Sequence, residues 1–194
     1  RPLNRKLVTA EYVHGQTGLD GIDLGEPHVP VTPGDGVDFI IDTLRREAPG
    51  TVTLHRVLRA PPERLYRAFL DPDAMAKWLP PHGFTGRVLE LDARVGGRYR
   101  MQFCNLATGQ VHAFGGEYLE LVPHERIVHT DRFDNAHLPG EMRTTVTFKP
   151  VSVGTELKVV QEGIPAMIPA EACYLGWQES LLLLAQPAEA AIPD

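Results

Sequence analysis

Hydrophobic residues recur near the end of the chain with the spacing of an amphipathic helix. At about 100° per residue, the apolar positions of residues 169–186 fall on one narrow stripe. The stripe consists of Cys173, Trp177, Leu181 and Leu184. Pro169 suits the first helical position, where its missing amide would be unpaired, and Pro187 cannot easily continue a helix. The pattern therefore predicts a long helix, anchored by Trp177, that lies against a sheet.

Leu175 and Leu182 project from the opposite side of the same helix, among Glu and Gln residues. That side is not purely a solvated face, so we expect a further surface to cover it. One candidate for that surface is the apolar side of residues 39–44, formed by Phe39, Ile40, Ile41 and Leu44, and another is a second copy of the chain in a homodimer.

The residues between 51 and 162 alternate between apolar and polar positions, divided by turn residues. Residues 51–59 predict a strand, and prolines begin a short helix at 60–70. Asp71 caps a second short helix that ends near 79. Six strands follow, at about 86–92, 96–104, 110–121, 125–133, 141–149 and 154–162. Strands joined this closely are most simply antiparallel.

This order predicts an α+β fold of the helix-grip type. A curved antiparallel sheet has one face to cover and one long amphipathic helix to cover it, so we expect the sheet to wrap around that helix. The two short helices after the first strand would close one end.

The first fifty residues differ from the rest because they are rich in Gly, Pro and Asp, with one helical pattern at 37–46. They are too few to bury a core of their own. We therefore divide the chain into an appendage (1–50), the helix-grip domain (51–187) and a short tail (188–194).

Composition narrows the functional classes. The chain has 194 residues, of which 43% are hydrophobic and 23% charged, with a net charge of -6. Its Lys and Arg residues are scattered, so we expect no nucleic-acid or membrane partner. No run approaches the roughly 20 apolar residues of a membrane span, and no signal-peptide core follows Arg1, so we expect a cytoplasmic protein.

Cysteine and histidine suggest no metal site. Cys104 and Cys173 are too few for a disulfide framework and are expected to be buried, reduced thiols. The eight histidines lack metal-ligand spacing, so we expect neither a zinc site nor another cofactor.

Alternation within the strands identifies the side chains that face the long helix. The inward sets are aromatic, so they would form either a packed core or an elongated apolar cavity. The candidate ligand-binding residues are Trp78, Tyr99, Met101, Phe103, Phe114, Tyr118, His129, Asp131, Phe133, Trp177 and Leu181.

His129 and Asp131 are the unusual members of this set, since they alternate with Ile127 and Phe133. If they face inward, mutual bonding or a functional pocket must offset a burial cost on the order of 2–7 kcal/mol for even a neutral polar group. The alternative is that this strand bulges or presents that face to water. No ordering of Ser, Cys, His or carboxylates indicates an enzyme class, so no catalytic residue is assigned.

Several spaced motifs resemble a known family. They are residues 60–69, Asp71-Pro-Asp-Ala-Met-Ala-Lys-Trp78, 92–101, 116–127 and Gly176-Trp177. Together they resemble the family named for activators of the heat-shock protein 90 ATPase, in the START-like (SRPBCC) superfamily that also holds polyketide cyclases and pollen allergens. The resemblance covers residues 51–186. It implies the helix-grip fold, and it favours the cavity over the packed core.

A second resemblance lies in residues 1–54. Glu11–Gly21, Val37–Asp42 and Pro49–Leu54 are similar to an internal piece of an inosine-uridine-type nucleoside hydrolase. That family binds calcium through an N-terminal aspartate cluster, which this chain lacks, and only His14 and Gly15 of its active-site region carry over. We therefore expect no hydrolase activity and interpret the join near Thr51–Leu54 as a fusion.

Three functions remain open on this basis. The first is the binding of a small apolar or aromatic molecule in a cavity between sheet and helix. The second, implied by the family name, is a module that interacts with a chaperone and stimulates its ATPase. The third is a cyclase or hydrolase-like reaction in the cavity, with His129 or Asp131 as acid or base.

Overall fold

The structure is a computed structural model that describes residues 50–190 of the chain. Its elements, in chain order, are β1 (Val52–Leu58), α2 (Pro62–Ala68), α3 (Pro72–Trp78), β2 (Phe84–Leu91), β3 (Arg98–Asn105), β4 (Val111–Val122), β5 (Arg126–Phe133), β6 (Met142–Val151), β7 (Gly154–Glu162) and α4 (Ala170–Glu189). The predicted order of strand, two short helices, six strands and one long helix is confirmed. The predicted helix at 37–46 and the hydrolase-like appendage lie outside the described residues, so the division into domains stays a prediction.

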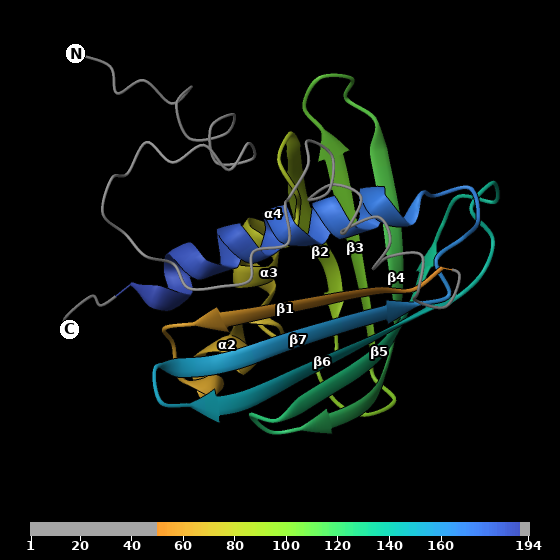
Figure 1. Ribbon diagram of the computed structural model, residues 1–194. Coiled ribbons are helices and arrows are strands. Elements are labelled where there is room, and N and C mark those ends of the chain that lie inside the picture. The colour runs from red at the N-terminus through yellow and green to blue at the C-terminus, as the bar shows by residue number, and fades with distance from the viewer. Residues whose placement is uncertain (1–49, 191–194) are drawn as a thin grey trace, which may run out of the picture. The chain divides into compact units, whose positions relative to one another are not determined.

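The strands form one antiparallel sheet in the order β1-β7-β6-β5-β4-β3-β2. The sheet is strongly curled, and α4 lies along its concave side (Figure 1). Register shifts between Val88 and Glu90 and between Tyr118 and Glu120 mark bulges, which bend strands locally. At Gly116 a Cβ atom would lie 1.8 Å from the Thr130 carbonyl oxygen, so only glycine fits at this close approach. The predicted helix-grip fold is therefore confirmed.

The two short helices bridge strands that are distant in the sheet, since α2 packs against β6 and α3 against β2. Helix α3 starts at the predicted cap, where the Asp71 carboxylate accepts a hydrogen bond from the Ala74 amide at 2.8 Å. The helix ends in the buried Trp78, whose indole Nε1 donates to the Ala68 carbonyl at 2.9 Å. This bond ties the end of α3 to the end of α2.

Helix α4 is longer than predicted, because it continues through Pro187 to Glu189. A proline in the last turn removes one backbone hydrogen bond, and tertiary contacts offset that loss. Ala188 is buried and its carbonyl accepts from the Arg64 guanidinium at 2.8 Å. The Glu189 carboxylate accepts from the Arg59 amide at 2.9 Å. Residues 188 and 189 thus belong to the helix and not to a tail.

The C-terminal half of α4 lies over a densely filled region that we call the packed end. Its aliphatic residues come from β1, α2, β7 and α4, and none is more than 3% exposed. They are Leu58, Leu65, Leu157, Leu184 and Ala188. Burial of this kind stabilises a fold by about 25 cal/mol per Å² of apolar surface. The packed end therefore holds α4 on the sheet.

The outer side of α4 carries the predicted apolar pair, with Leu175 58% and Leu182 47% exposed. The surface expected to cover them stays a prediction. Within residues 50–190, none of the helices is long and apolar enough to cross a membrane.

Candidate functional site

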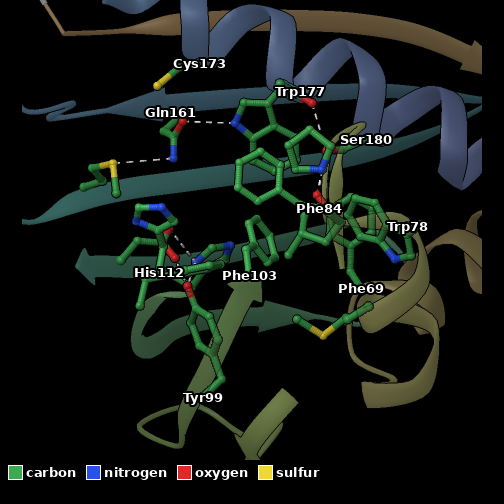
Figure 2. A pocket seen from close by; sticks show the side chains of 18 of the residues that line it. Phe69, Trp78, Phe84, Tyr99, Phe103, His112, Gln161, Cys173, Trp177 and Ser180 are labelled. Carbon is green, nitrogen blue, oxygen red and sulfur yellow. Dashed lines mark hydrogen bonds and ion pairs between the residues drawn. The ribbon is translucent and has the colours of Figure 1, made fainter. Parts of the chain in front are cut away.

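A cavity of about 310 Å³ lies between the concave face of the sheet and the N-terminal half of α4. Figure 2 shows Trp177 and Ser180 reaching it from α4, with Phe84, Phe103 and Tyr99 on the sheet side. Its size is near the lower end of the roughly 300–1,000 Å³ found for small-molecule pockets. We call this region, with the side chains that line it, the cavity end of the domain.

Aromatic rings form one wall of the cavity in a continuous series of contacts. The ring of Phe103 lies 4.9 Å from that of Phe114 at 79°, and Phe114 lies 6.2 Å from Phe133. Phe84 continues the series at 6.4 Å from both Phe103 and the His112 ring. These edge-to-face and tilted arrangements suit the charge distribution of aromatic rings.

A polar cluster forms the floor of the cavity, around the carboxylate of Asp131. The Tyr99 hydroxyl donates to Asp131 Oδ1, and the Thr144 hydroxyl donates to Asp131 Oδ2 at 3.1 Å. Nδ1 of His129 lies 3.2 Å from Asp131 Oδ2 and 3.0 Å from the Tyr99 hydroxyl. His129 and Asp131 therefore face inward, lie 3.2 Å apart and share the Tyr99 hydroxyl as a partner, and the alternative of a solvent-facing or bulged strand is wrong.

Burial controls the charge of this floor. It lowers the pKa of His129 to about 4 and raises the pKa of Asp131 to about 7. The same desolvation raises the pKa of the Tyr118 phenol, which stays protonated. His129 is thus a neutral imidazole near pH 7, although the Thr130 carbonyl partly opposes its shift.

A second polar group lies under α4. The Gln161 side-chain oxygen accepts from the Trp177 indole Nε1 at 3.0 Å, and its nitrogen donates to the Met142 sulfur at 3.7 Å (Figure 2). The Ser180 hydroxyl donates a hydrogen bond to the Leu79 carbonyl oxygen at 2.7 Å. These polar side chains bond within the cavity wall and leave a mainly apolar interior.

Gly176 is one of the residues of α4 that line the cavity. It lies in the middle of α4 between wall residues, and a Cβ atom built there would meet nothing within 4 Å. Glycine in a helix interior is unfavourable by roughly 0.5–1 kcal/mol relative to alanine. The helix thus carries a residue that disfavours helix formation at a position that lines the cavity.

The structure brings together nine of the eleven candidate ligand-binding residues. Those on the cavity wall are Trp78, Tyr99, Phe103, Phe114, Tyr118, His129, Asp131, Phe133 and Trp177. Met101 is 0% and Leu181 2% exposed, and neither lines the cavity, because other core residues cover them. That these nine residues contact a ligand stays a prediction.

Sequence reasoning missed several wall residues that carry a recognisable signal. Gln161 follows the buried Leu157 and Val159 at two-residue steps in β7, so it is a polar residue on an apolar face. Ser180 and Gly176 lie beside Trp177 on the inward stripe of α4. A small or polar residue within an otherwise apolar stripe could have identified each of them.

Reactive groups at the site are few. Cys173 lies on the cavity wall as a free, half-buried thiol, and burial raises its pKa. Cys104 is also free and half-buried, less enclosed than predicted. No three His, Cys, Asp or Glu side chains in the described part of the chain are arranged to hold a metal ion.

Comparison with known proteins identifies relatives of the described domain. The profile of the family described as "Activator of Hsp90 ATPase homolog 1-like protein" matches residues 59–189. The crystal structure of protein CV1439 from Chromobacterium violaceum is 65% identical, with a TM-score of 0.73, and covers 76% of this chain and 100% of that chain. An AHSA1-like protein of Aeromonas hydrophila shares the fold at 19% identity, with a TM-score of 0.60 over 73% of this chain and 93% of that chain.

Two curated proteins match over short segments. An uncharacterised protein of Schizosaccharomyces pombe is 48% identical over 54 residues, or 28% of this chain and 17% of that protein. The pyrimidine-specific ribonucleoside hydrolase RihA of Salmonella typhimurium is 44% identical over 48 residues, or 25% of this chain and 15% of the enzyme. The chain thus spans less than a fifth of the length of either.

Proposed function

The chain belongs to the family of activator of Hsp90 ATPase homolog 1-like proteins, and on that premise we propose that its domain binds a small, largely apolar aromatic molecule in the cavity. Fold alone does not specify this, because one scaffold of this kind hosts many activities. The proposal therefore depends on the chemistry of the cavity wall.

The observation that carries the proposal is the open space at Gly176. A cavity that only reflected imperfect packing could be filled by any larger residue at this position, with a gain in helix stability. Instead the helix has glycine where the surrounding wall is aromatic. We interpret the glycine as the residue that keeps the space available for a ligand.

The apolar wall indicates the kind of molecule. Phe103, Phe114 and Phe133 present rings to the cavity from three adjacent strands, and Trp177 faces it from α4. Rings pack against rings in the edge-to-face geometry already present among the wall residues. An aromatic ligand would continue that arrangement.

Filling the cavity tests the proposal. Gly176→Leu adds a branched side chain at a position that lines the cavity and whose Cβ would meet nothing within 4 Å, so the fold should be retained while the binding of aromatic probes falls at least tenfold. Gly176→Ala is the matched control, since it gives the same helix gain but adds only one methyl group. Binding of naphthalene and its derivatives, measured by fluorescence and by the shift in melting temperature, compares the two.

The proposal is wrong if no aromatic probe binds the wild-type protein, or if Gly176→Leu binds as tightly as Gly176→Ala. Native mass spectrometry of the purified protein adds an independent check. A co-purified small molecule should be present on the wild-type protein and depleted on Gly176→Leu.

The buried histidine bears on the enzymatic alternative. A general base works best when its pKa is near the working pH, and the pKa of His129 is lowered to about 4 by burial. A neutral imidazole of this kind is a weak base but a good hydrogen-bond acceptor. This supports binding over proton transfer as the role of the polar floor.

A further inference from the structure

The two ring nitrogens of His129 have different surroundings. Nδ1 lies 3.0 Å from the Tyr99 hydroxyl, 3.2 Å from Asp131 Oδ2 and 3.4 Å from the Thr130 carbonyl oxygen. Nε2 has no hydrogen-bond partner among residues 50–190, and His129 lines the cavity. The nitrogen left for the cavity is therefore Nε2.

The neighbours of Nδ1 fix the position of the imidazole proton. The Tyr99 hydroxyl has two acceptors besides the ring, Asp131 Oδ1 and the Thr130 carbonyl oxygen at 3.1 Å, so when its single proton goes to either of them the tyrosine oxygen acts as an acceptor toward the ring. The Thr130 carbonyl is an acceptor as well, and so is the Asp131 carboxylate above pH 7, where it is ionised. Since acceptors surround Nδ1, Nδ1 carries the proton and Nε2 presents a bare lone pair.

An unpaired acceptor in an apolar cavity is costly, because burial removes its water without replacing the hydrogen bond. The other polar wall groups offer Nε2 no partner, since Ser180 bonds to a backbone carbonyl and Gln161 bonds to Trp177 and Met142. A ligand that lacked a donor would leave Nε2 unpaired. A ligand with a donor at the floor would satisfy it.

We propose that the ligand is a hydroxylated aromatic molecule, a phenol or an enol, whose hydroxyl group donates a hydrogen bond to Nε2 of His129. This rests on the proposed function and adds the chemical class of the ligand. Tyr99, Asp131 and Thr144 are then positioning residues, because they set the tautomer of the histidine without contacting the ligand.

Three probes of similar shape separate this inference from the proposed function. Naphthalene and 2-methoxynaphthalene carry no donor, whereas 2-naphthol carries one hydroxyl. The wild-type full chain should bind 2-naphthol roughly three- to tenfold more tightly than either of the others, as measured by isothermal titration calorimetry. Equal affinity for all three overturns the inference and leaves the proposed function standing. Failure of all three to bind overturns both.

Two matched variants locate the effect. His129→Phe keeps a ring of similar shape but removes the acceptor, so the ratio of its affinities for 2-naphthol and naphthalene should fall to about one, whatever its absolute affinity for naphthalene. His55→Phe makes the same exchange at an exposed position of β1 and should keep the preference. A preference that survives in His129→Phe overturns the inference.

A spectroscopic measurement on the wild type keeps the test independent of folding in the variant. The nitrogen-15 spectrum of the protein labelled at histidine should show His129 with a protonated Nδ1 and an unprotonated Nε2. Addition of 2-naphthol should shift the Nε2 resonance, and addition of 2-methoxynaphthalene should leave it in place. A protonated Nε2 in the free protein overturns the inference.

Discussion

The packed end and the cavity end share the same sheet and the same helix, yet only one of them is filled. At the packed end, Leu184 of α4 and Leu157 of β7 are almost fully buried. At the cavity end, four residues further along β7, Gln161 bonds to Trp177 of α4 across the edge of an open space. The difference lies in the side chains and not in the backbone architecture.

Aliphatic side chains at the packed end adapt their rotamers and interdigitate, as expected for protein interiors. Rings at the cavity end are held in fixed mutual orientations, and the helix has Gly176 where a side chain would fill the gap. The two interpretations considered from the sequence, a packed core and an apolar cavity, are therefore both present, one at each end. The packed end stabilises the fold so that the other end can remain open.

Truncation should have very different effects at the two ends. Leu184→Ala removes a side chain that is 0% exposed, so it should lower the free energy of unfolding by about 2–5 kcal/mol. Cys173→Ala removes an atom that already borders empty space and should cost under about 1 kcal/mol. Urea denaturation measures both. Equal costs would mean that the two ends are packed alike.

The stability contributed by the cavity end should depend on pH, because its floor holds the titratable groups of Asp131 and His129. Burial raises the pKa of Asp131 from 3.8 to about 7 and lowers that of His129 from 6.5 to about 4. Because ionised Asp131 is disfavoured in the folded protein, its contribution to stability is lost as the pH rises from about 4 to 7. Because protonated His129 is disfavoured in the folded protein, its contribution to stability is gained as the pH rises from about 4 to 6.5. The Asp131 contribution is about 4 kcal/mol and the His129 contribution about 3 kcal/mol, so the two largely cancel in the wild type.

Substitution of either His129 or Asp131 should reveal the pH dependence that the remaining residue contributes. His129→Phe keeps only the Asp131 contribution and should lose stability as the pH rises from about 4 to 7, whereas Asp131→Asn keeps only the His129 contribution and should gain stability from about 4 to 6.5. The variant with both changes is the control and should follow the wild type. Urea denaturation at several pH values gives the slopes, and slopes of the same sign in the two single variants would contradict the opposing shifts.

The bond between the helix and the sheet at the cavity end should contribute less than the packed end. Trp177→Phe removes the donor to Gln161 and leaves a buried amide oxygen unpaired, at an expected cost of about 1–3 kcal/mol. A double-mutant cycle with Gln161→Leu isolates the pair. Additive costs in that cycle would show that the hydrogen bond contributes nothing.

The smallest expected effect is a gain in stability instead of a loss. Gly176→Ala should raise the free energy of unfolding by roughly 0.5–1 kcal/mol, because it adds helix propensity without a clash. Gly116→Ala is the contrasting change, since its Cβ would lie 1.8 Å from the Thr130 carbonyl oxygen and should destabilise the protein. A thermal melt of each variant shows the sign.

Residue periodicity was sufficient to predict most of the fold. Two-residue steps placed Tyr99 and Phe103 on the inner face of β3, and the helical stripe placed Trp177 over the sheet. Both predictions follow from local geometry, because the position of a residue along its strand or helix sets the direction of its side chain. The Asp71 cap was equally local, since its partner is three residues away.

Features that depend on residues far apart in the chain could not be predicted in this way. The partner of His129 is Tyr99, thirty residues earlier, and that bond decides whether a buried histidine is tolerated. Pro187 was expected to end α4, but contacts from Arg59 and Arg64, more than a hundred residues away, hold the last turn. Whether the aromatic rings leave a cavity depends on all of their tertiary contacts together, and the spacing of apolar residues along the chain does not specify those contacts.

The bulge in β2 also has a consequence for association between molecules. In the described part of the chain the sheet ends at β2, and an exposed edge strand can pair with an edge of another molecule and start aggregation. The register shift between Val88 and Glu90 interrupts the regular row of backbone donors and acceptors on that edge. Arg87 and Glu90 add charge beside the interruption. The irregularity that helps to bend the sheet thus also makes its edge a poor template for a further strand.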